Sequence, residues 1–106
     1  MSAQHASRTP SRGTVDRDAI VQSYIGEGLT PRRWSSAPGD AFAAHRHAQH
    51  KVLHCLRGSI TFLIVATGES IELSPGDRLD LPAGVEHAAV AGAGGCECVE
   101  AYRGAE

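Results

Sequence analysis

The stretch GDAFAAHRHAQHKVLHCLRG, residues 39–58, decides the fold because it fixes the spacing of two glycines, a histidine pair and a lysine. His45 and His47 are separated by one residue, and side chains at i and i+2 of a strand point to the same side. The two imidazoles are therefore expected to converge while Arg46 faces away. Such a pair suits a transition metal, although solvated pairs also occur, and an open metal site needs a further ligand from elsewhere in the chain.

A second stretch, GDRLDLPAGVEHA (76–88), supplies the best candidate for that ligand. His87 follows a tight turn in which Pro82 sets φ and Gly84 accepts a conformation that other residues resist. Strands that flank turns in a small barrel bring such residues within reach of one another. Residues 39–58 and 76–88 together predict a three-histidine site.

The two stretches follow the patterns G-x5-H-x-H-x3-K-x6-G and G-x5-P-x-G-x2-H. They resemble the two motifs of the cupin family, G-x5-H-x-H-x3,4-E-x6-G and G-x5-P-x-G-x2-H-x3-N. The resemblance covers roughly residues 38–91, and two positions depart from it: Lys51 replaces the glutamate and Ala91 the asparagine. It implies an all-β fold, a small jelly-roll-like barrel of two antiparallel sheets after an N-terminal extension, and a homodimer.

The resemblance also implies a site and a class of function. Cupins usually bind one divalent metal through the histidines and glutamate of these motifs. His45, His47 and His87 carry over as ligands of iron, zinc, nickel or manganese, whereas Lys51 does not. The implied protein is a metal-dependent enzyme, of the dioxygenase or isomerase class, that acts on a small molecule.

Lys51 leaves three outcomes open, because an ammonium 4 Å from a divalent cation is repelled by about 4 kcal/mol per unit of metal charge at a dielectric of about 20. The side chain loses its proton and ligates, turns toward the barrel mouth beside a three-histidine site, or takes the place of the metal. The last outcome is the alternative function, a non-catalytic module that binds a small molecule or anion. A scaffold that only dimerises is a third hypothesis, which a filled barrel would support.

Other polar residues near these motifs are weaker candidates. His50 is expected near the rim, as a substitute ligand at most. Alternation places Cys55 on the Lys51 face, as a pocket thiol or an inert core residue, and His54 on the opposite face, packed or at an interface. Glu86 and Tyr102 are further candidates for the pocket.

The rest of the chain predicts one β domain. From Leu29 onward, short apolar segments are separated by turn residues every eight to twelve positions, which is typical of a sandwich or barrel. Residues 16–28 have apolar side chains at helical spacing and form either a short helix or an extended arm. Strands are predicted over residues 51–58, 59–66, 70–77, 78–84, 87–92 and 96–102.

Composition sets the remaining expectations. The chain has 106 residues, which fits a single domain over residues 15–106, and residues 1–14 read as a disordered tail. The net charge of −2 gives no reason to expect nucleic acid or an anionic membrane as partner. Three cysteines without a secretory signal favour a cytoplasmic setting, with Cys96 and Cys98 as small buried residues of the last strand.

Overall fold

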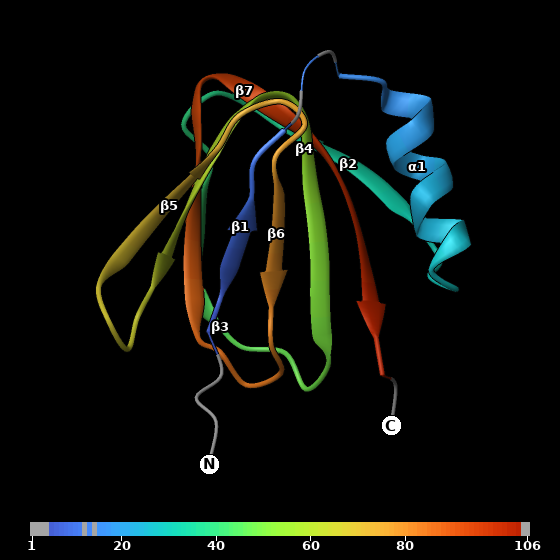
Figure 1. Cartoon of the computed structure of the whole chain (residues 1–106). Helices are drawn as coiled ribbons and strands as arrows, with labels where there is room; N and C mark the ends of the chain where they lie inside the picture. Colours follow the sequence, from blue (N-terminus) through green and yellow to red (C-terminus); the bar gives the residue numbers. More distant parts are fainter. Residues whose placement is uncertain (1–4, 12, 14, 105–106) are drawn as a thin grey trace.

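The computed structural model describes residues 5–11, 13 and 15–104, and within them one helix and seven strands. All strand pairs are antiparallel, which confirms the predicted all-β fold. In chain order the elements are β1 (Ser7–Thr9), α1 (Arg17–Gly26), β2 (Arg32–Ser36), β3 (Ala41–His45), β4 (His50–Ile64), β5 (Glu69–Leu73), β6 (Arg78–Leu81) and β7 (His87–Arg103) (Figure 1).

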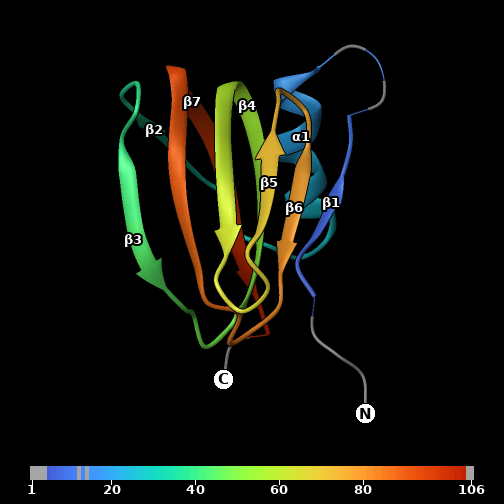
Figure 2. The same cartoon turned by 90° about the vertical axis from the view of Figure 1, so that its left-hand side faces the viewer.

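The two longest strands, β4 and β7, pair with each other along almost their whole length and form the spine of the fold. The first half of β4 also pairs with β6 and its second half with β5. Likewise β7 pairs first with β3 and then with β2. The ribbon of β4 and β7 bends, so that its two halves contribute to opposite walls of the barrel (Figures 1 and 2).

The bend depends on two glycines, one on each strand, that come into close contact where the ribbon turns. Gly58 and Gly95 have φ angles of 73° and 75°, in the left-handed region that favours glycine. A Cβ at Gly58 would lie 2.0 Å from the carbonyl oxygen of Gly95, so no larger residue fits. The register shifts on both sides of Gly58, yet the pairing with β7 continues. For this reason the strands predicted separately over 51–58 and 59–66 are one strand, β4, and those over 87–92 and 96–102 are both parts of β7.

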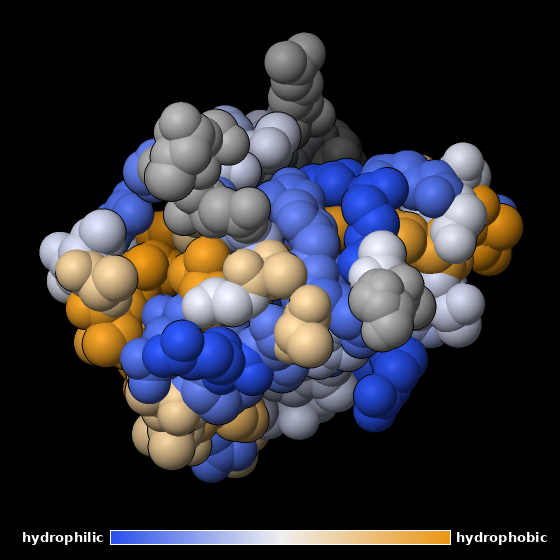
Figure 3. Space-filling model, turned by 90° about the horizontal axis from the view of Figure 1, so that it is seen from below, coloured by the Kyte–Doolittle hydropathy of each residue, from blue (hydrophilic) through white to orange (hydrophobic). Residues whose placement is uncertain are grey.

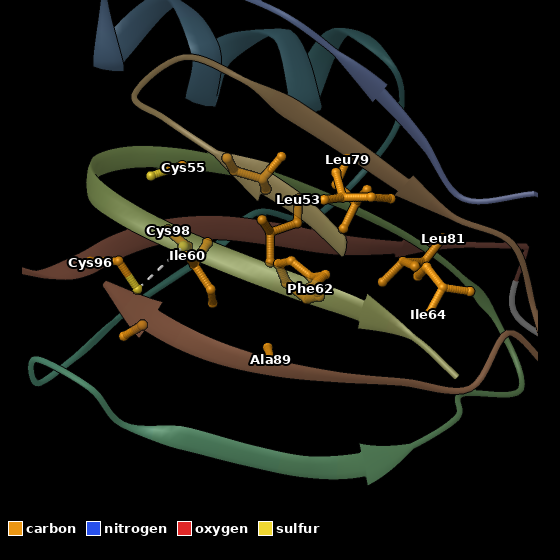
Figure 4. Close-up of a cluster of buried hydrophobic side chains, with 13 residues drawn as sticks. Leu53, Cys55, Ile60, Phe62, Ile64, Leu79, Leu81, Ala89, Cys96 and Cys98 are labelled. Carbon is orange, nitrogen blue, oxygen red and sulfur yellow. Dashed lines mark hydrogen bonds between the residues drawn. The ribbon is translucent and has the colours of Figure 1, made fainter. Parts of the chain in front are cut away.

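Side chains of the ribbon alternate between two buried clusters. The inner cluster lies inside the barrel (Figure 4), and the outer cluster lies beneath helix α1. Cys96 and Cys98 belong to the inner cluster and are fully buried, as predicted. The outer cluster contains Tyr24, Leu29, Val52, Leu56, Val99 and Ala101.

The sequence left two alternatives open for residues 16–28, a short helix or an extended arm, and the structure shows the helix α1. Its N-cap is Asp16, whose carboxylate accepts a hydrogen bond of 3.0 Å from the backbone N–H of Ala19. The helix places Tyr24 in the outer cluster. No helix in the described part of the chain is long and apolar enough to cross a membrane.

The N-terminal segment differs from the predicted disordered tail where it is described. Ser7–Thr9 form β1, which pairs with the edge strand β6. The buried carboxylate of Asp77 accepts hydrogen bonds from the backbone N–H of Ser11 (2.8 Å) and Ser74 (2.9 Å) and pairs with Arg8 (3.1 Å). An edge strand has backbone N–H and C=O groups that are free to pair with another segment. The N-terminal segment pairs with β6 in this way, which amino-acid composition alone does not predict. Residues 1–4, 12 and 14 lie outside the described residues.

Candidate metal centre

Three histidines meet at the end of the barrel where β3 ends and β7 begins. His45 is the last residue of β3, His87 is the first residue of β7, and the two are direct cross-strand partners. His47 follows in the loop before β4. One ligand nitrogen from each of the three residues lies within 4.8 Å of the others. The structure thus brings together the three histidines that the sequence predicted as a site.

Backbone carbonyl groups orient two of the imidazoles. His45 Nδ1 lies 2.8 Å from the carbonyl oxygen of Ala43, and His87 Nδ1 lies 2.9 Å from that of Val85. Because a carbonyl only accepts, each Nδ1 carries the proton and donates it. Each Nε2 therefore keeps a free lone pair. This outer contact is the one that commonly fixes the tautomer and ring orientation of a metal-ligating histidine.

Two imidazole nitrogens of the triad are buried without a partner among the described residues. Neither His47 Nε2 nor His87 Nε2 has a hydrogen-bond partner among the described residues. Leaving a buried polar group unsatisfied costs about 1–3 kcal/mol. Two such atoms on converging rings fit a divalent cation, which would accept both lone pairs.

Electrostatics keep these imidazoles in the form that ligates. Burial lowers the pKa of His47, and the positive charge of Lys51 lowers it further. Burial also lowers the pKa of His87. The hydrogen bond to the carbonyl of Val85 opposes this shift, and the charges of His45 and Lys51 add smaller contributions in the same direction as burial. Both rings are therefore neutral at pH 7, as a metal ligand must be.

Lys51 lies inside the barrel but is directed to a carboxylate instead of the imidazoles. Its Nζ is 3.1 Å from Glu100 Oε1 on β7, and the indole Nε1 of Trp34 on β2 donates to the same oxygen at 2.9 Å. Lys51 and Glu100 are only 7% and 9% exposed. The carboxylate of Glu100 therefore compensates the positive charge of Lys51 inside the barrel. This arrangement differs from each of the three outcomes considered from the sequence, because the side chain neither reaches the mouth nor fills the triad.

Sequence reasoning missed Glu100, although the signal was present. The inward-facing residues of the last strand alternate, so Cys96, Cys98, Glu100 and Tyr102 share a face. Alternation therefore made Glu100 a candidate partner for the charge of Lys51, but the alignment of β4 with β7 decides which residues meet.

The other candidates lie apart from the triad, except for Tyr102. The Nε2 of His50 is 2.9 Å from Asp80 Oδ1, and Cys55 is fully buried in the inner cluster. Glu86 forms an exposed pair with Arg46. The ring of Tyr102 lies 5.3 Å from that of His47, between ring centroids.

His54 lies on the opposite face from Lys51, as alternation predicted. Its ring packs beneath helix α1, where Nδ1 lies 2.8 Å from the hydroxyl oxygen of Tyr24. His54 therefore belongs to the packing of the helix and takes no part in the triad.

A cavity of about 240 Å³ adjoins the triad. Its presence counts against the filled barrel expected of a scaffold that only dimerises. Figure 3 shows the end of the molecule that carries the loops around the triad. On this face the hydrophilic residues gather in the middle, and hydrophobic residues lie to the left and right of them. The apolar part of the cavity wall consists of Trp34, Phe42, Ile60, Phe62 and Ala89. The polar part consists of Arg32, His45, Lys51, His87 and Glu100.

Comparison with protein families identifies the class of protein. The family model described as "Cupin domain" matches residues 32–102, so the chain belongs to the cupin family. The curated proteins contain no match.

Solved structures show the same fold. An RmlC-like cupin from Shewanella frigidimarina has a TM-score of 0.63 at 22% identity, covering 74% of this chain and 68% of its own. The polyketide cyclase RemF from Streptomyces resistomycificus has a TM-score of 0.63 at 24% identity, with 70% and 54% covered. The DMSP lyase DddQ from Ruegeria pomeroyi has a TM-score of 0.65 at 24% identity, and the match covers 72% of this chain and 38% of DddQ. The chain thus spans only about half of RemF and less of DddQ, and at these identities the likeness shows the fold alone.

Proposed function

We propose that this cupin binds one divalent transition metal through His45, His47 and His87 and acts as an enzyme on a small molecule held in the adjoining cavity. The observation that carries the proposal is the pair of buried Nε2 atoms, on His47 and His87, for which the described residues offer no hydrogen-bond partner. Lys51 does not satisfy them, because its ammonium pairs with Glu100. The donor set supports iron, zinc, nickel or manganese, since all four accept imidazole.

A metal held by the three histidines would supply Lewis acidity to an oxygen of the ligand. The chain supplies the remainder. The carbonyl groups of Ala43 and Val85 hold two imidazoles in one tautomer. The aromatic wall beside the triad excludes water from the ligand and strengthens electrostatic interactions there. Glu100 compensates the charge of Lys51, so that the lysine opposes a cation less than its position alone suggests.

The alternative is a non-catalytic cupin in which Lys51 replaces the metal and binds an anion. The ion pair with Glu100 weakens that alternative, because the ammonium already has an anionic partner within the chain. A measurement of the metal content of the protein distinguishes this alternative from the proposal.

The test is elemental analysis of protein prepared without a histidine tag, before and after reconstitution with each metal. We expect one metal per chain in the wild type and none in His47→Ala or His87→Ala. His50→Ala is the matched control: it removes an imidazole from the same segment, HRHAQHK, but one that contacts Asp80. This variant should keep its metal.

Two results would contradict the proposal. The first is a wild-type protein that takes up no metal, and the second is equal loss of metal in His50→Ala and His87→Ala. Metal bound by Lys51→Glu but not by the wild type would favour the anion-binding alternative.

A further inference from the structure

Lys51 is the only lysine in a chain that otherwise uses arginine for its permanent positive charges. Among the ion pairs between described residues, that of Lys51 with Glu100 is the only one in which both side chains are buried. Arginine is the usual choice for a buried ion pair, whereas lysine is the cation that can give up its proton. A lysine at this one position therefore points to a role that needs an amine as well as a charge.

The carboxylate of Glu100 is placed to take that proton. Its Oε1 lies 3.1 Å from Lys51 Nζ and accepts a hydrogen bond of 2.9 Å from the indole Nε1 of Trp34. Direct proton transfer needs a base within about 2.6–3.2 Å of the donor atom. Because Trp34 holds the carboxylate in this position, the proton passes from Nζ to Oε1 without rearrangement of the pair. The product is a neutral amine, which is a nucleophile.

The amine of Lys51 is accessible from the cavity beside the triad. Lys51 lines this cavity, whose volume is about 240 Å³. Drug-sized ligands occupy pockets of about 300–1,000 Å³, so the ligand here is a smaller molecule. Trp34, Phe42 and Phe62 form an apolar part of the same wall. A wall of this kind excludes water and so protects a bond between the amine and a ligand from hydrolysis.

The triad lies within reach of a ligand that reacts with Lys51. His45 and His87 line the same cavity. The ring of Tyr102 lies near both groups, since its centroid is 6.0 Å from Lys51 Nζ and 5.3 Å from the centroid of the His47 ring. A ligand bonded to Nζ through one carbon can therefore present an oxygen on its next carbon to a metal at the triad.

We propose that Lys51 forms a protonated imine with a small aldehyde or ketone that carries a hydroxyl group on the neighbouring carbon. Glu100 takes one proton from the ammonium, and the neutral amine adds to the carbonyl carbon, whose π electrons move to oxygen. A second proton passes from nitrogen to this oxygen, and Glu100 returns the first. The carbon–oxygen bond then breaks, and the oxygen leaves as water.

One ammonium and one carbonyl thus give one iminium and one water, and no oxidant or reductant takes part. Trp34 acts as a positioning residue, because it touches only Glu100 in this step. The inference rests on the proposed function in taking this cavity as the ligand site and the triad as the metal site that receives the hydroxyl oxygen.

The test traps the imine with sodium cyanoborohydride, which reduces it to a stable secondary amine. The probes are glycolaldehyde and propionaldehyde, which have similar sizes but differ in that only the first carries a hydroxyl group. Arg57→Lys supplies an internal reference, because Arg57 is exposed and no ion pair between described residues includes it. Peptide mapping by mass spectrometry then gives the rate of modification at Lys51 and at the introduced lysine in the same molecule.

A structural role and the proposed role predict opposite results. A buried ammonium that only pairs with Glu100 reacts more slowly than an exposed lysine. We expect Lys51 to react at least about tenfold faster than the introduced lysine in the folded protein, and this preference to vanish in urea. The result does not depend on any change to the buried pair.

The role of the carboxylate is tested with Glu100→Asp. This variant keeps the charge that compensates Lys51 but withdraws the carboxylate by one methylene group, so the rate at Lys51 should fall by about tenfold or more. Glu72→Asp makes the same change at an exposed glutamate of β5 and should leave the rate unchanged. Equal rates in Glu100→Asp and the wild type would overturn the assignment of Glu100 as the proton acceptor.

Both aldehydes are tested on metal-free and on zinc-loaded protein, and the metal content is measured on the same samples. Zinc should raise the preference for Lys51 with glycolaldehyde and not with propionaldehyde, and an equal effect on both would overturn the choice of a hydroxyl-bearing ligand. Slower reaction of Lys51 than of the introduced lysine would overturn the inference as a whole. A protein that takes up no zinc but still reacts preferentially at Lys51 refutes the proposed metal function alone, and a zinc-loaded protein in which Lys51 is protected refutes this inference alone.

Discussion

His54 and His87 lie on the two paired strands β4 and β7, face opposite sides of the ribbon, and are both buried. Burial lowers the pKa of each imidazole. On the outer side, His54 Nδ1 has the hydroxyl of Tyr24 at 2.8 Å. On the inner side, His87 Nε2 has no partner in the described chain. Burial and a lowered pKa are thus common to both histidines, and what distinguishes the proposed ligand His87 is a buried ring nitrogen without a partner among the described residues.

The same contrast separates two carboxylates of β7. Glu97 faces outward and pairs with Arg17 and Arg33 near solvent, while Glu100 faces inward and pairs with Lys51. The outward pairs belong to the surface and contribute little to stability. The inward pair is a buried charge pair beside a cavity, where solvent and salt screen it much less.

The largest effect is expected from breaking the inward pair. Glu100→Gln leaves the ammonium of Lys51 buried without an anion, and removal of one partner from a buried pair costs about 3–5 kcal/mol. Urea unfolding of the metal-free protein measures the loss. Glu97→Gln is the control and should cost at most about 1 kcal/mol, because its partners are exposed.

A second variant makes this prediction specific to the charge. Lys51→Met/Glu100→Gln removes both charges and should recover most of the stability that Glu100→Gln loses. Equal stability of the single and the double variant would show that the pair is not what Glu100 contributes.

The pH dependence of the free energy of unfolding tests the burial of His54 on the outer side of the ribbon. Burial, with a smaller contribution from Arg78, lowers the pKa of His54 from 6.5 to about 4, against opposing effects of Asp80 and Glu27. Between these two values the unfolded chain binds more protons than the folded chain, so stability falls as the pH falls from 6.5 toward 4. Linkage gives a loss of about 2 kcal/mol between pH 7 and pH 5 from this residue.

The matched control for the pH prediction is His54→Asn, which has no group that titrates in this range. Urea unfolding at pH 7 and pH 5 should show a smaller loss in the variant than in the wild type, by about 2 kcal/mol. Equal losses would show that His54 takes up its proton in the folded state without cost, against the burial that the structure shows.

The sequence predicted the fold because the spacing of its two stretches resembles the cupin motifs, and that resemblance also named the three histidines that the structure brings together. Strand alternation alone does not explain the triad, because His47 lies in the loop after β3 and His45 meets His87 through the pairing of β3 with β7. Alternation along β4 did place His54 correctly, since that geometry is set within one strand.

The partner of Lys51 and the course of the bend could not be read in the same way. The contact between Lys51 and Glu100 joins residues that are 49 positions apart, and it depends on how β4 and β7 are aligned. The strand breaks predicted at Gly58 and in β7 fail for a related reason. A glycine that ends a strand and a glycine that bends a continuous one look the same in the sequence, until Gly95 is found in contact with Gly58.

The smallest effect is expected from the hydroxyl of Tyr24. Tyr24→Phe keeps the ring in the outer cluster but removes the contacts of the hydroxyl with His54 Nδ1 and with the carbonyl oxygen of Val99, which should lower stability by about 1 kcal/mol. Affinity for zinc, measured by competition with a chelator, should be unchanged, since Tyr24 lies across the sheet from the triad. A drop in zinc affinity would mean that the packing of helix α1 helps to hold the inner histidines in place, and the two faces of the ribbon would then be energetically coupled instead of independent.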